Sequence, residues 1–284
     1  MNTFKGMISL RAALVGGYLL LLAFMYLFQG KLIFLPSSDL IVTPQDAGLN
    51  AEDVWIETGD GEQLHGWYFP NNSAEYVVVL SHGNAGNISN RIDIAKFLQE
   101  IGVSVLIYDY RGYGQSSGEP SEEGFYSDIE AVINYLKTEE KYSEQRMILY
   151  GRSLGGAVAS YAASKFDVSG LVLDSAFKNL KAMVSDLYPF VPAFLASYEF
   201  PTEQYLQQLS GMPVMIMHSP NDTIVDISHG RALFEIAKEP KTFVELRGGH
   251  NDSFHASVDI HSKSWKAFLR VLNEQRSSKM EENK

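Results

Sequence analysis

Gly151-Arg152-Ser153-Leu154-Gly155 fits the pattern Gly-x-Ser-x-Gly, and its surroundings are those the pattern requires. The apolar run at residues 147–150 predicts a buried strand before it, and the small residues at 157–163 predict a closely packed helix after it. A serine on a sharp turn between a strand and a helix projects its hydroxyl clear of the sheet, and flanking glycines let the backbone turn tightly. The helix N-terminus also presents unpaired N–H groups to developing negative charge. Ser153 is therefore the candidate nucleophile, against the alternative of a glycine-rich turn with an incidental serine.

Strand-like and helix-like segments alternate beyond Pro36. Residues 54–58 and 63–68 flank Gly59-Asp60-Gly61 and predict a hairpin. Six further runs lack polar alternation, as strands covered on both faces do; they are residues 76–80, 103–108, 147–150, 170–173, 213–217 and 242–246. Amphipathic stretches predict helices at 91–101, 122–138, 154–165, 227–238 and 258–272. This alternation predicts an α/β fold, with a mostly parallel sheet and helices on both faces.

One interval breaks the alternation after the sixth strand. Residues 178–210 are rich in aromatic residues and proline, and we expect them to form a short lid above Ser153. Because binding pockets are mostly apolar, Phe190 and Phe194 are candidate substrate-binding residues. The alternative is that the lid aromatics only pack onto the core. Residues 277–284 are polar and are expected to form a frayed tail.

The N-terminal segment is predicted to be a membrane anchor. Residues 12–28 carry no charge, and with Arg11 snorkelling the apolar stretch reaches roughly the 20 residues that span a bilayer. A cleaved signal peptide and a buried core helix are the alternatives. The apolar core is longer than that of a usual signal peptide, and no Ala-x-Ala-like site follows. We therefore expect a single-pass anchor at residues 1–30 and one domain at 31–276.

Charge indicates the orientation of this anchor. Lys5 and Arg11 precede the span, whereas Lys31 is the only nearby cation after it, and acidic residues follow. The positive-inside rule then places the N-terminus in the cytoplasm and the domain across the membrane.

The net charge of −11 and the lack of a basic stripe argue against nucleic-acid binding. The chain has no cysteine, which excludes disulfides, thiolate metal sites and a cysteine nucleophile.

Four sequences match the N-glycosylation pattern, beginning at Asn71, Asn87, Asn221 and Asn251. Two of them lie beside the candidate acid and base introduced below, where a bulky glycan would obstruct the site. A chain exported through a glycosylating lumen would not be expected to keep them. The predicted location is therefore the bacterial inner membrane, with the domain in the periplasm.

A serine hydroxyl needs an adjacent base, and the base needs a carboxylate to orient it. Asp222 follows the predicted strand 213–217, and His250 follows 242–246, so both stand at carboxyl ends of strands, where such groups converge. His255 is the rival base and Asp174 the rival acid. We favour His250 because Gly248 and Gly249 suit a loop that must pass close to Ser153.

An oxyanion hole needs backbone N–H groups that point at the developing charge. Leu154 directly follows the nucleophile and supplies one donor. The glycine-containing loop after the third predicted strand suits the second, for which Asn84 is the candidate. For His82 in the same loop, we favour a structural hydrogen bond over a catalytic role.

Four stretches together resemble the α/β-hydrolase superfamily, and within it the membrane-anchored, bud-emergence-like and ABHD-type serine hydrolases. They are HGNAGN at residues 82–87, YDYRGYG at 108–114, GRSLGG at 151–156 and Gly249-His250. The resemblance covers nearly the whole chain, including the anchor followed by KLIFLP at 31–36. It implies an eight-stranded sheet, a Ser153–Asp222–His250 triad, and Asn84 and Leu154 as oxyanion donors. Ser219, where glycine is frequent, and Asp226, where proline is common, depart from the family pattern.

No metal and no cofactor are expected. His218 and Asp222 have four-residue spacing, but in a strand-to-loop segment, and Gly112-Tyr113-Gly114 lacks the remaining glycine of a dinucleotide motif. The sequence therefore predicts a membrane-anchored serine hydrolase that cleaves carboxylic ester or thioester bonds of a small-molecule or lipid-like acyl substrate through an acyl-enzyme. A serine peptidase or aminopeptidase of the same fold, and a catalytically silent binding domain, are the alternatives.

Overall fold

The computed structural model describes residues 2–282, in which eight strands form one sheet. In chain order the strands are β2 (Glu52–Glu57), β3 (Gln63–Phe69), β4 (Val77–Ser81), β6 (Ser104–Tyr108), β7 (Met147–Arg152), β8 (Gly170–Asp174), β9 (Val214–His218) and β10 (Lys241–Glu245). Their spatial order is β10-β9-β8-β7-β4-β6-β3-β2. Strand β3 is antiparallel to both of its neighbours, and all other neighbouring pairs are parallel. The predicted eight-stranded, mostly parallel sheet is confirmed.

Burial explains why the central strands have continuous apolar sequences. Every residue of β4, β6, β7, β8 and β9 is buried, because helices cover both faces of the sheet there. The edge strand β2 alternates instead, with Val54 and Ile56 buried and the residues beside them exposed. The hairpin predicted between β2 and β3 is present, with Gly61 in its turn at a φ of 91°.

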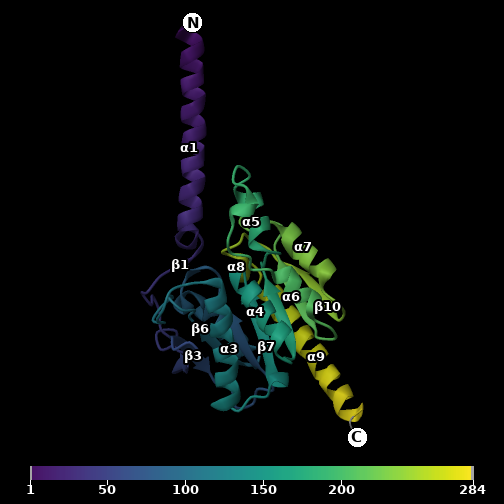
Figure 1. Ribbon diagram of the computed structural model, residues 1–284. Coiled ribbons are helices and arrows are strands. Elements are labelled where there is room, and N and C mark those ends of the chain that lie inside the picture. The colour runs from purple at the N-terminus through teal and green to yellow at the C-terminus, as the bar shows by residue number, and fades with distance from the viewer. Residues whose placement is uncertain (1, 283–284) are drawn as a thin grey trace.

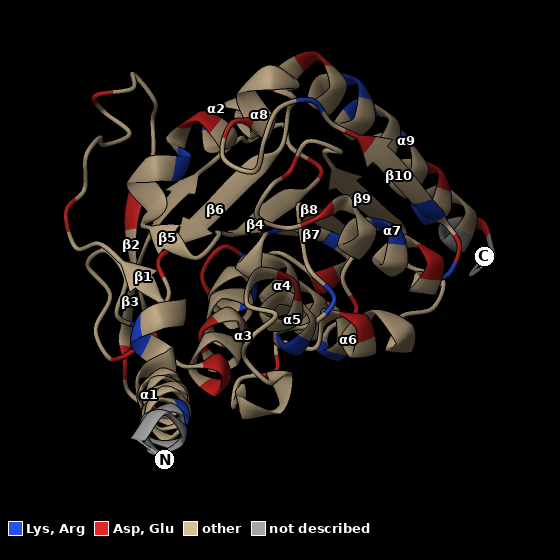
Figure 2. Ribbon diagram, turned by 90° about the horizontal axis from the view of Figure 1, so that it is seen from above, with Lys and Arg blue, Asp and Glu red and all other residues tan. Residues whose placement is uncertain are grey.

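Two hydrophobic clusters lie on opposite faces of the sheet. One face carries α3 (Glu122–Thr138), α4 (Leu154–Lys165), α6 (Thr202–Gln208) and α7 (Ile227–Ile236). The other carries α2 (Ile92–Glu100), α8 (Ser253–Ala256) and α9 (Val258–Glu282). Figure 2 shows these two helical layers with the sheet between them. Of the tail expected at residues 277–284, residues 277–282 continue helix α9, which extends from Val258 through Glu282, and residues 283–284 lie outside the described residues.

Helix α1 (Asn2–Ile33) projects away from the domain (Figure 1). Its segment Leu10–Ile33 has 24 residues and a mean hydropathy of 1.8, and none of it is buried. The helix is thus long and apolar enough to cross a membrane.

The base of α1 is joined to the domain by a two-stranded sheet of its own. Strand β1 (Leu35–Pro36) directly follows α1 and pairs in parallel with β5 (Ala85–Gly86), in the loop after β4. The backbone N–H of Ser37 also donates to the carbonyl of Gly86 at 3.2 Å. The apolar helix is therefore tied directly to the loop that carries the candidate oxyanion donor Asn84.

The predicted lid, residues 178–210, contains three short helices: α5 (Leu180–Leu187), the 3-10 helix η3 (Ala193–Leu195) and α6. Figure 1 shows α5 and the loop after it rising on the same side of the domain as α1. Two further 3-10 helices, η1 (Ile88–Arg91) and η2 (Glu144–Arg146), precede α2 and β7. The lid and α1 thus share one end of the molecule.

Candidate active site

Ser153 occupies the sharp turn between β7 and α4 in a backbone conformation that residues with a side chain rarely adopt, with φ 53° and ψ −118°. Close packing around it requires glycine at two positions. A Cβ at Gly155 would lie 2.0 Å from the carbonyl oxygen of Ser81, and one at Gly151 would lie 2.2 Å from the carbonyl oxygen of Gly155. The predicted turn is therefore present, with its glycines where the backbone leaves no room for a side chain.

Ser153, His250 and Asp222 form one hydrogen-bonded chain. Nε2 of His250 lies 3.2 Å from Oγ of Ser153, and Nδ1 of the same ring lies 2.7 Å from Oδ2 of Asp222. The three residues follow β7, β10 and β9, whose carboxyl ends meet at one edge of the sheet. The structure thus brings the three predicted residues together in the order that a nucleophile, a base and an orienting acid require.

Asp222 is buried and its carboxylate is well supported. Oδ1 accepts the backbone N–H groups of Ile224 at 2.9 Å and Val225 at 2.8 Å, which leaves Oδ2 for the imidazole. Burial alone would raise the pKa of Asp222, but the hydrogen bond and charge of His250 and the two backbone N–H groups outweigh it and lower the pKa below 3.8. Asp222 is therefore an anion at neutral pH and can stabilise a protonated imidazole.

The rival residues lie elsewhere. The carboxylate of Asp174 is buried and accepts hydrogen bonds from the hydroxyls of Tyr150 at 2.8 Å and Ser175 at 3.0 Å. Its backbone carbonyl accepts the N–H of Ser153, so it supports the turn rather than the imidazole. His255 has an exposed side chain that lies 3.7 Å from Asp93. The geometry therefore favours Asp222 and His250 over both rivals.

Two side chains that sequence reasoning did not assign to the site support it. Arg152 donates from its guanidinium to the carbonyl of His250, which fixes the loop that carries the base. Nε2 of the buried His218 donates to the carbonyl of Val225 at 2.8 Å and lies 3.6 Å from Asp222. Burial lowers the pKa of His218, so this ring stays neutral beside the acid. Arg152 occupies the first x of the Gly-x-Ser-x-Gly pattern, so the motif pointed to its position. Nothing in the sequence marks the role of His218.

The loop after β4 lies directly against the nucleophile. A Cβ at Gly83 would lie 3.5 Å from Cβ of Ser153, so the next residue, Asn84, comes close to the site. The side chain of Asn84 accepts a hydrogen bond from the hydroxyl of Tyr113 at 3.1 Å. The buried ring of His82 contacts the carbonyl of Gly83 through Nδ1 at 2.7 Å, which agrees with the structural role expected for it. Tyr113 and His82 thus both hold this loop, and Asn84 and Leu154 line the same cavity beside Ser153.

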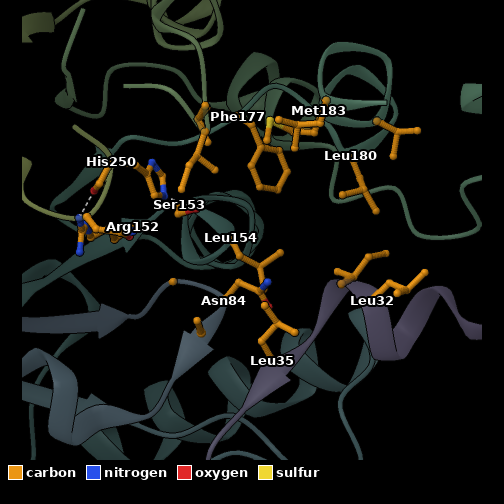
Figure 3. Close-up of a pocket in the computed structure, with 18 of the residues that line it drawn as sticks. Leu32, Leu35, Asn84, Arg152, Ser153, Leu154, Phe177, Leu180, Met183 and His250 are labelled. Carbon is orange, nitrogen blue, oxygen red and sulfur yellow. Dashed lines mark hydrogen bonds between the residues drawn. The ribbon is translucent and has the colours of Figure 1, made fainter. Parts of the chain in front are cut away.

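A cavity of about 400 Å³ opens beside Ser153. Its apolar walls come from the base of α1 and from the lid, with Leu32 and Leu35 on one side and Leu180 and Met183 on the other (Figure 3). Arg152, Ser153 and His250 lie together at one end of the cavity (Figure 3), and Asn84 and Asn251 also line it. Phe190 and Phe194 do not line this cavity; they are exposed near the outer end of the lid. The structure therefore does not place these two candidate substrate-binding residues beside Ser153.

Known proteins share this arrangement of elements. Residues 76–200 match the family model described as the alpha/beta hydrolase fold. The uncharacterized protein Rv2307c of Mycobacterium tuberculosis is 35% identical over 81% of this chain and 83% of its own length. The chain belongs to the α/β-hydrolase fold family. The uncharacterized membrane protein YNL320W of Saccharomyces cerevisiae is 34% identical over 81% of this chain and 86% of its own.

Among solved structures, this α/β hydrolase is similar to the Pyrococcus furiosus esterase Pf2001, with a TM-score of 0.71. The superposition covers 84% of this chain and 97% of the esterase at 22% sequence identity. The likeness shows a shared fold.

Proposed function

We propose that this chain is a membrane-anchored serine hydrolase that cleaves carboxylic ester or thioester bonds through an acyl-enzyme. The observation that carries the proposal is the hydrogen-bonded chain from Ser153 through His250 to Asp222 at the N-terminus of α4. The Pyrococcus furiosus protein of the same fold is named an esterase, and this supports ester substrates for the present chain.

The first half-reaction forms the acyl-enzyme. Nε2 of His250 takes the hydroxyl proton of Ser153 as Oγ attacks the acyl carbon, and Asp222 stabilises the resulting imidazolium. The N–H groups of Leu154 and Asn84 hold the oxyanion of the tetrahedral intermediate. The leaving alcohol or thiol departs with the proton from Nε2, and the acyl group remains on Oγ.

The second half-reaction releases the acid. Water gives a proton to Nε2 of His250 and attacks the acyl carbon, forming a second tetrahedral intermediate. Collapse of this intermediate returns the proton to Oγ of Ser153 and frees the carboxylic acid. No step needs a metal or a cofactor.

We propose further that α1 anchors the enzyme in a bacterial inner membrane with its domain in the periplasm. The charge difference across α1 supports this orientation. The side chain of Asn87, within one of the four glycosylation patterns, is buried and donates to the carbonyls of Ser37 at 2.9 Å and Asp39 at 2.8 Å. A glycan would replace one of the two hydrogens on that buried nitrogen and so remove at least one of these bonds, which argues against folding in a glycosylating compartment.

A substrate panel tests the proposed chemistry. The full-length protein in detergent is assayed with oxygen esters, thioesters, aminoacyl amides and peptides, beside the Ser153→Ala variant as control. We expect hydrolysis of esters or thioesters that depends on Ser153. Cleavage of peptides without cleavage of esters would contradict the proposal and favour a peptidase, and turnover that survives in Ser153→Ala would contradict the mechanism.

A further inference from the structure

The cavity beside Ser153 continues along α1. A second cavity of about 350 Å³ lies between α1 and the lid, and both cavities are lined by Leu32, Ile33, Val184 and Tyr188. Together they form one groove, the anchor groove, that leads from Ser153 as far as Leu21 on α1. Within the described residues 2–282, no charged side chain lines the part of the groove between α1 and the lid.

The dimensions and polarity of the anchor groove fit an acyl chain. At about 1.5 Å per residue, the stretch of α1 from Leu21 to Ile33 is roughly 18 Å long. One leaflet contributes about half of the ~30 Å hydrocarbon core of a bilayer, or roughly 15 Å. The polar groups lie at the opposite end, around Ser153 and His250. A lipid lying along α1 would therefore bring the carbonyl at the head of its acyl chain to the nucleophile.

The outer end of the lid lies beside the apolar part of α1. The hydroxyl of Tyr18 donates to the backbone carbonyl of Phe190 at 2.6 Å. Tyr18 lies within the apolar segment Leu10–Ile33, roughly 22 Å along the helix from Ile33 at ~1.5 Å per residue. If that segment spans the bilayer, the outer end of the lid must enter the hydrocarbon core from the side of the domain.

The composition of the lid fits such a position. No charged residue occurs from Leu187 to Tyr198, and the side chain of Phe194 is 80% exposed. Irregular backbone is tolerated at membrane depth only where its polar groups find partners. Here α1 supplies two, because Tyr18 bonds the carbonyl of Phe190 and Oε1 of Gln29 accepts the N–H of Ser197 at 2.8 Å.

Proline lowers the free-energy cost of placing irregular backbone at membrane depth, because it has no N–H group that needs a partner. Pro189 and Pro192 stand in the irregular part of the lid. The N–H of Val191 donates to the carbonyl of Tyr188 at 2.8 Å, and that of Leu195 donates to the carbonyl of Pro192 at 3.0 Å. The outer lid is thus both apolar on its surface and well supplied with internal hydrogen bonds.

We propose that this hydrolase takes its substrate sideways from the bilayer. The substrate class is a membrane lipid with an ester or thioester carbonyl, its acyl chain lying in the anchor groove and its carbonyl at Ser153. In this arrangement Phe190 and Phe194 insert into the leaflet beside the entrance instead of forming the acyl pocket. The substrate assignment rests on the proposed hydrolase function, whereas the insertion of the lid does not.

The insertion is tested first, without reference to catalysis. Because the chain has no cysteine, Phe194→Cys can be labelled at one position with an environment-sensitive fluorophore. Ser278→Cys, on an exposed part of α9 at the end of the molecule away from α1, is the matched control (Figure 1). Both variants are reconstituted in dioleoylphosphatidylcholine vesicles containing a lipid with a nitroxide on its acyl chain.

We expect the nitroxide lipid to quench the label at position 194 at least threefold more than the label at 278. Equal quenching at the two positions would overturn the insertion of the lid. If the label at position 194 stays unquenched and the unlabelled Phe194→Cys variant forms a disulfide-linked dimer, a second copy covers this surface and the proposal is wrong.

The route of the substrate is tested with Ala196→Trp, which fills the anchor groove, and Ala193→Trp, a matched change outside its lining. In the same vesicles, the measured quantity is the ratio of kcat/KM for 4-methylumbelliferyl palmitate to kcat/KM for the acetate. We expect the ratio to fall at least tenfold in Ala196→Trp and to stay within twofold of the wild type in Ala193→Trp. An unchanged ratio in Ala196→Trp, with labelling of Ser153 by a small fluorophosphonate retained, would overturn the route.

The two proposals fail separately. If the wild-type protein hydrolyses neither ester and is not labelled by the fluorophosphonate, the hydrolase function fails, and the quenching experiment alone decides the insertion. If the protein is labelled and hydrolyses the acetate in a Ser153-dependent way, but the ratio is insensitive to the groove, only the lipid substrate assignment fails.

Discussion

Replacing Asp222 by asparagine should stop turnover, and the way the carboxylate is held explains why. Its Oδ1 accepts two backbone N–H groups, from Ile224 and Val225, and its Oδ2 faces Nδ1 of His250 at 2.7 Å. An asparagine must keep its only oxygen on those two N–H groups, because its NH₂ group cannot accept them. The NH₂ group then faces Nδ1 and favours the tautomer that carries its proton on Nε2. That tautomer cannot take the proton of Ser153.

We expect Asp222→Asn to lower kcat by about 10⁴, the loss typical of such a tautomer change. This corresponds to about 5.4 kcal/mol in activation free energy at ~1.36 kcal/mol per tenfold. The assay is hydrolysis of a soluble ester by the full-length protein in detergent, with circular dichroism and the Tm to check folding. The fold should persist, since asparagine has nearly the same shape and keeps both backbone hydrogen bonds.

Asp174→Asn is the matched control. Asp174 is also a buried carboxylate at the end of a strand, but it bonds Tyr150 and Ser175 rather than His250. It should keep most of the activity. If Asp174→Asn removes turnover and a folded Asp222→Asn keeps it, the assignment of the orienting acid is wrong.

Three further outcomes are expected. Adding His250→Ala to Ser153→Ala should cost little activity beyond Ser153→Ala alone, because the residues act as one unit; a large additional loss would contradict that coupling. Burial lowers the pKa of His261 below 6.5, so the folded state binds fewer protons than the unfolded state, and stability falls as pH drops through and below about 6.5. His261→Leu should flatten this fall by up to ~1.4 kcal/mol per pH unit, measured as unfolding free energy from pH 7 to 5; an unchanged slope would contradict it. Protease added to spheroplasts should digest the domain, and protection of an intact domain until lysis would place it in the cytoplasm.

The sheet and the serine turn could be predicted because their sequence signals are local. Strands buried on both faces have continuous apolar runs, and the backbone at Ser153 leaves room only for glycine at residues 151 and 155. The positions of Asp222 and His250 followed from topology, since both stand just after strands whose ends converge with that of β7. The strands and the serine turn are thus each specified within a short segment, and the convergence of the strand ends follows from their parallel arrangement.

The remaining features depend on contacts between distant segments. Strand β1 has two residues and exists only because β5 pairs with it, so no periodicity could reveal it. The short helix α5 lies in the aromatic-rich interval, where composition indicated a lid but not which side chains face Ser153. Leu180 and Met183 take that place, and Phe190 and Phe194 do not.

The residue that supports Asp222 could not be predicted from the sequence for the same reason. His218 is buried beside Asp222 and bonds the carbonyl of Val225, a contact across a loop whose path the sequence does not specify. The polar sequence at 277–284 predicted a frayed tail, yet α9 continues through its described part as far as Glu282. Local composition underestimates a helix that extends from a core-packed segment, in which Trp265 and Phe268 are buried against the sheet.

The nucleophilic role of Ser153 is tested most directly by covalent labelling of the intact protein with a fluorophosphonate, with the site identified by mass spectrometry of its peptides. We expect one adduct on the peptide that contains Ser153, absent from Ser153→Ala and formed much more slowly in His250→Ala. No adduct on the folded protein, or an adduct on a different serine that persists in Ser153→Ala, would contradict it.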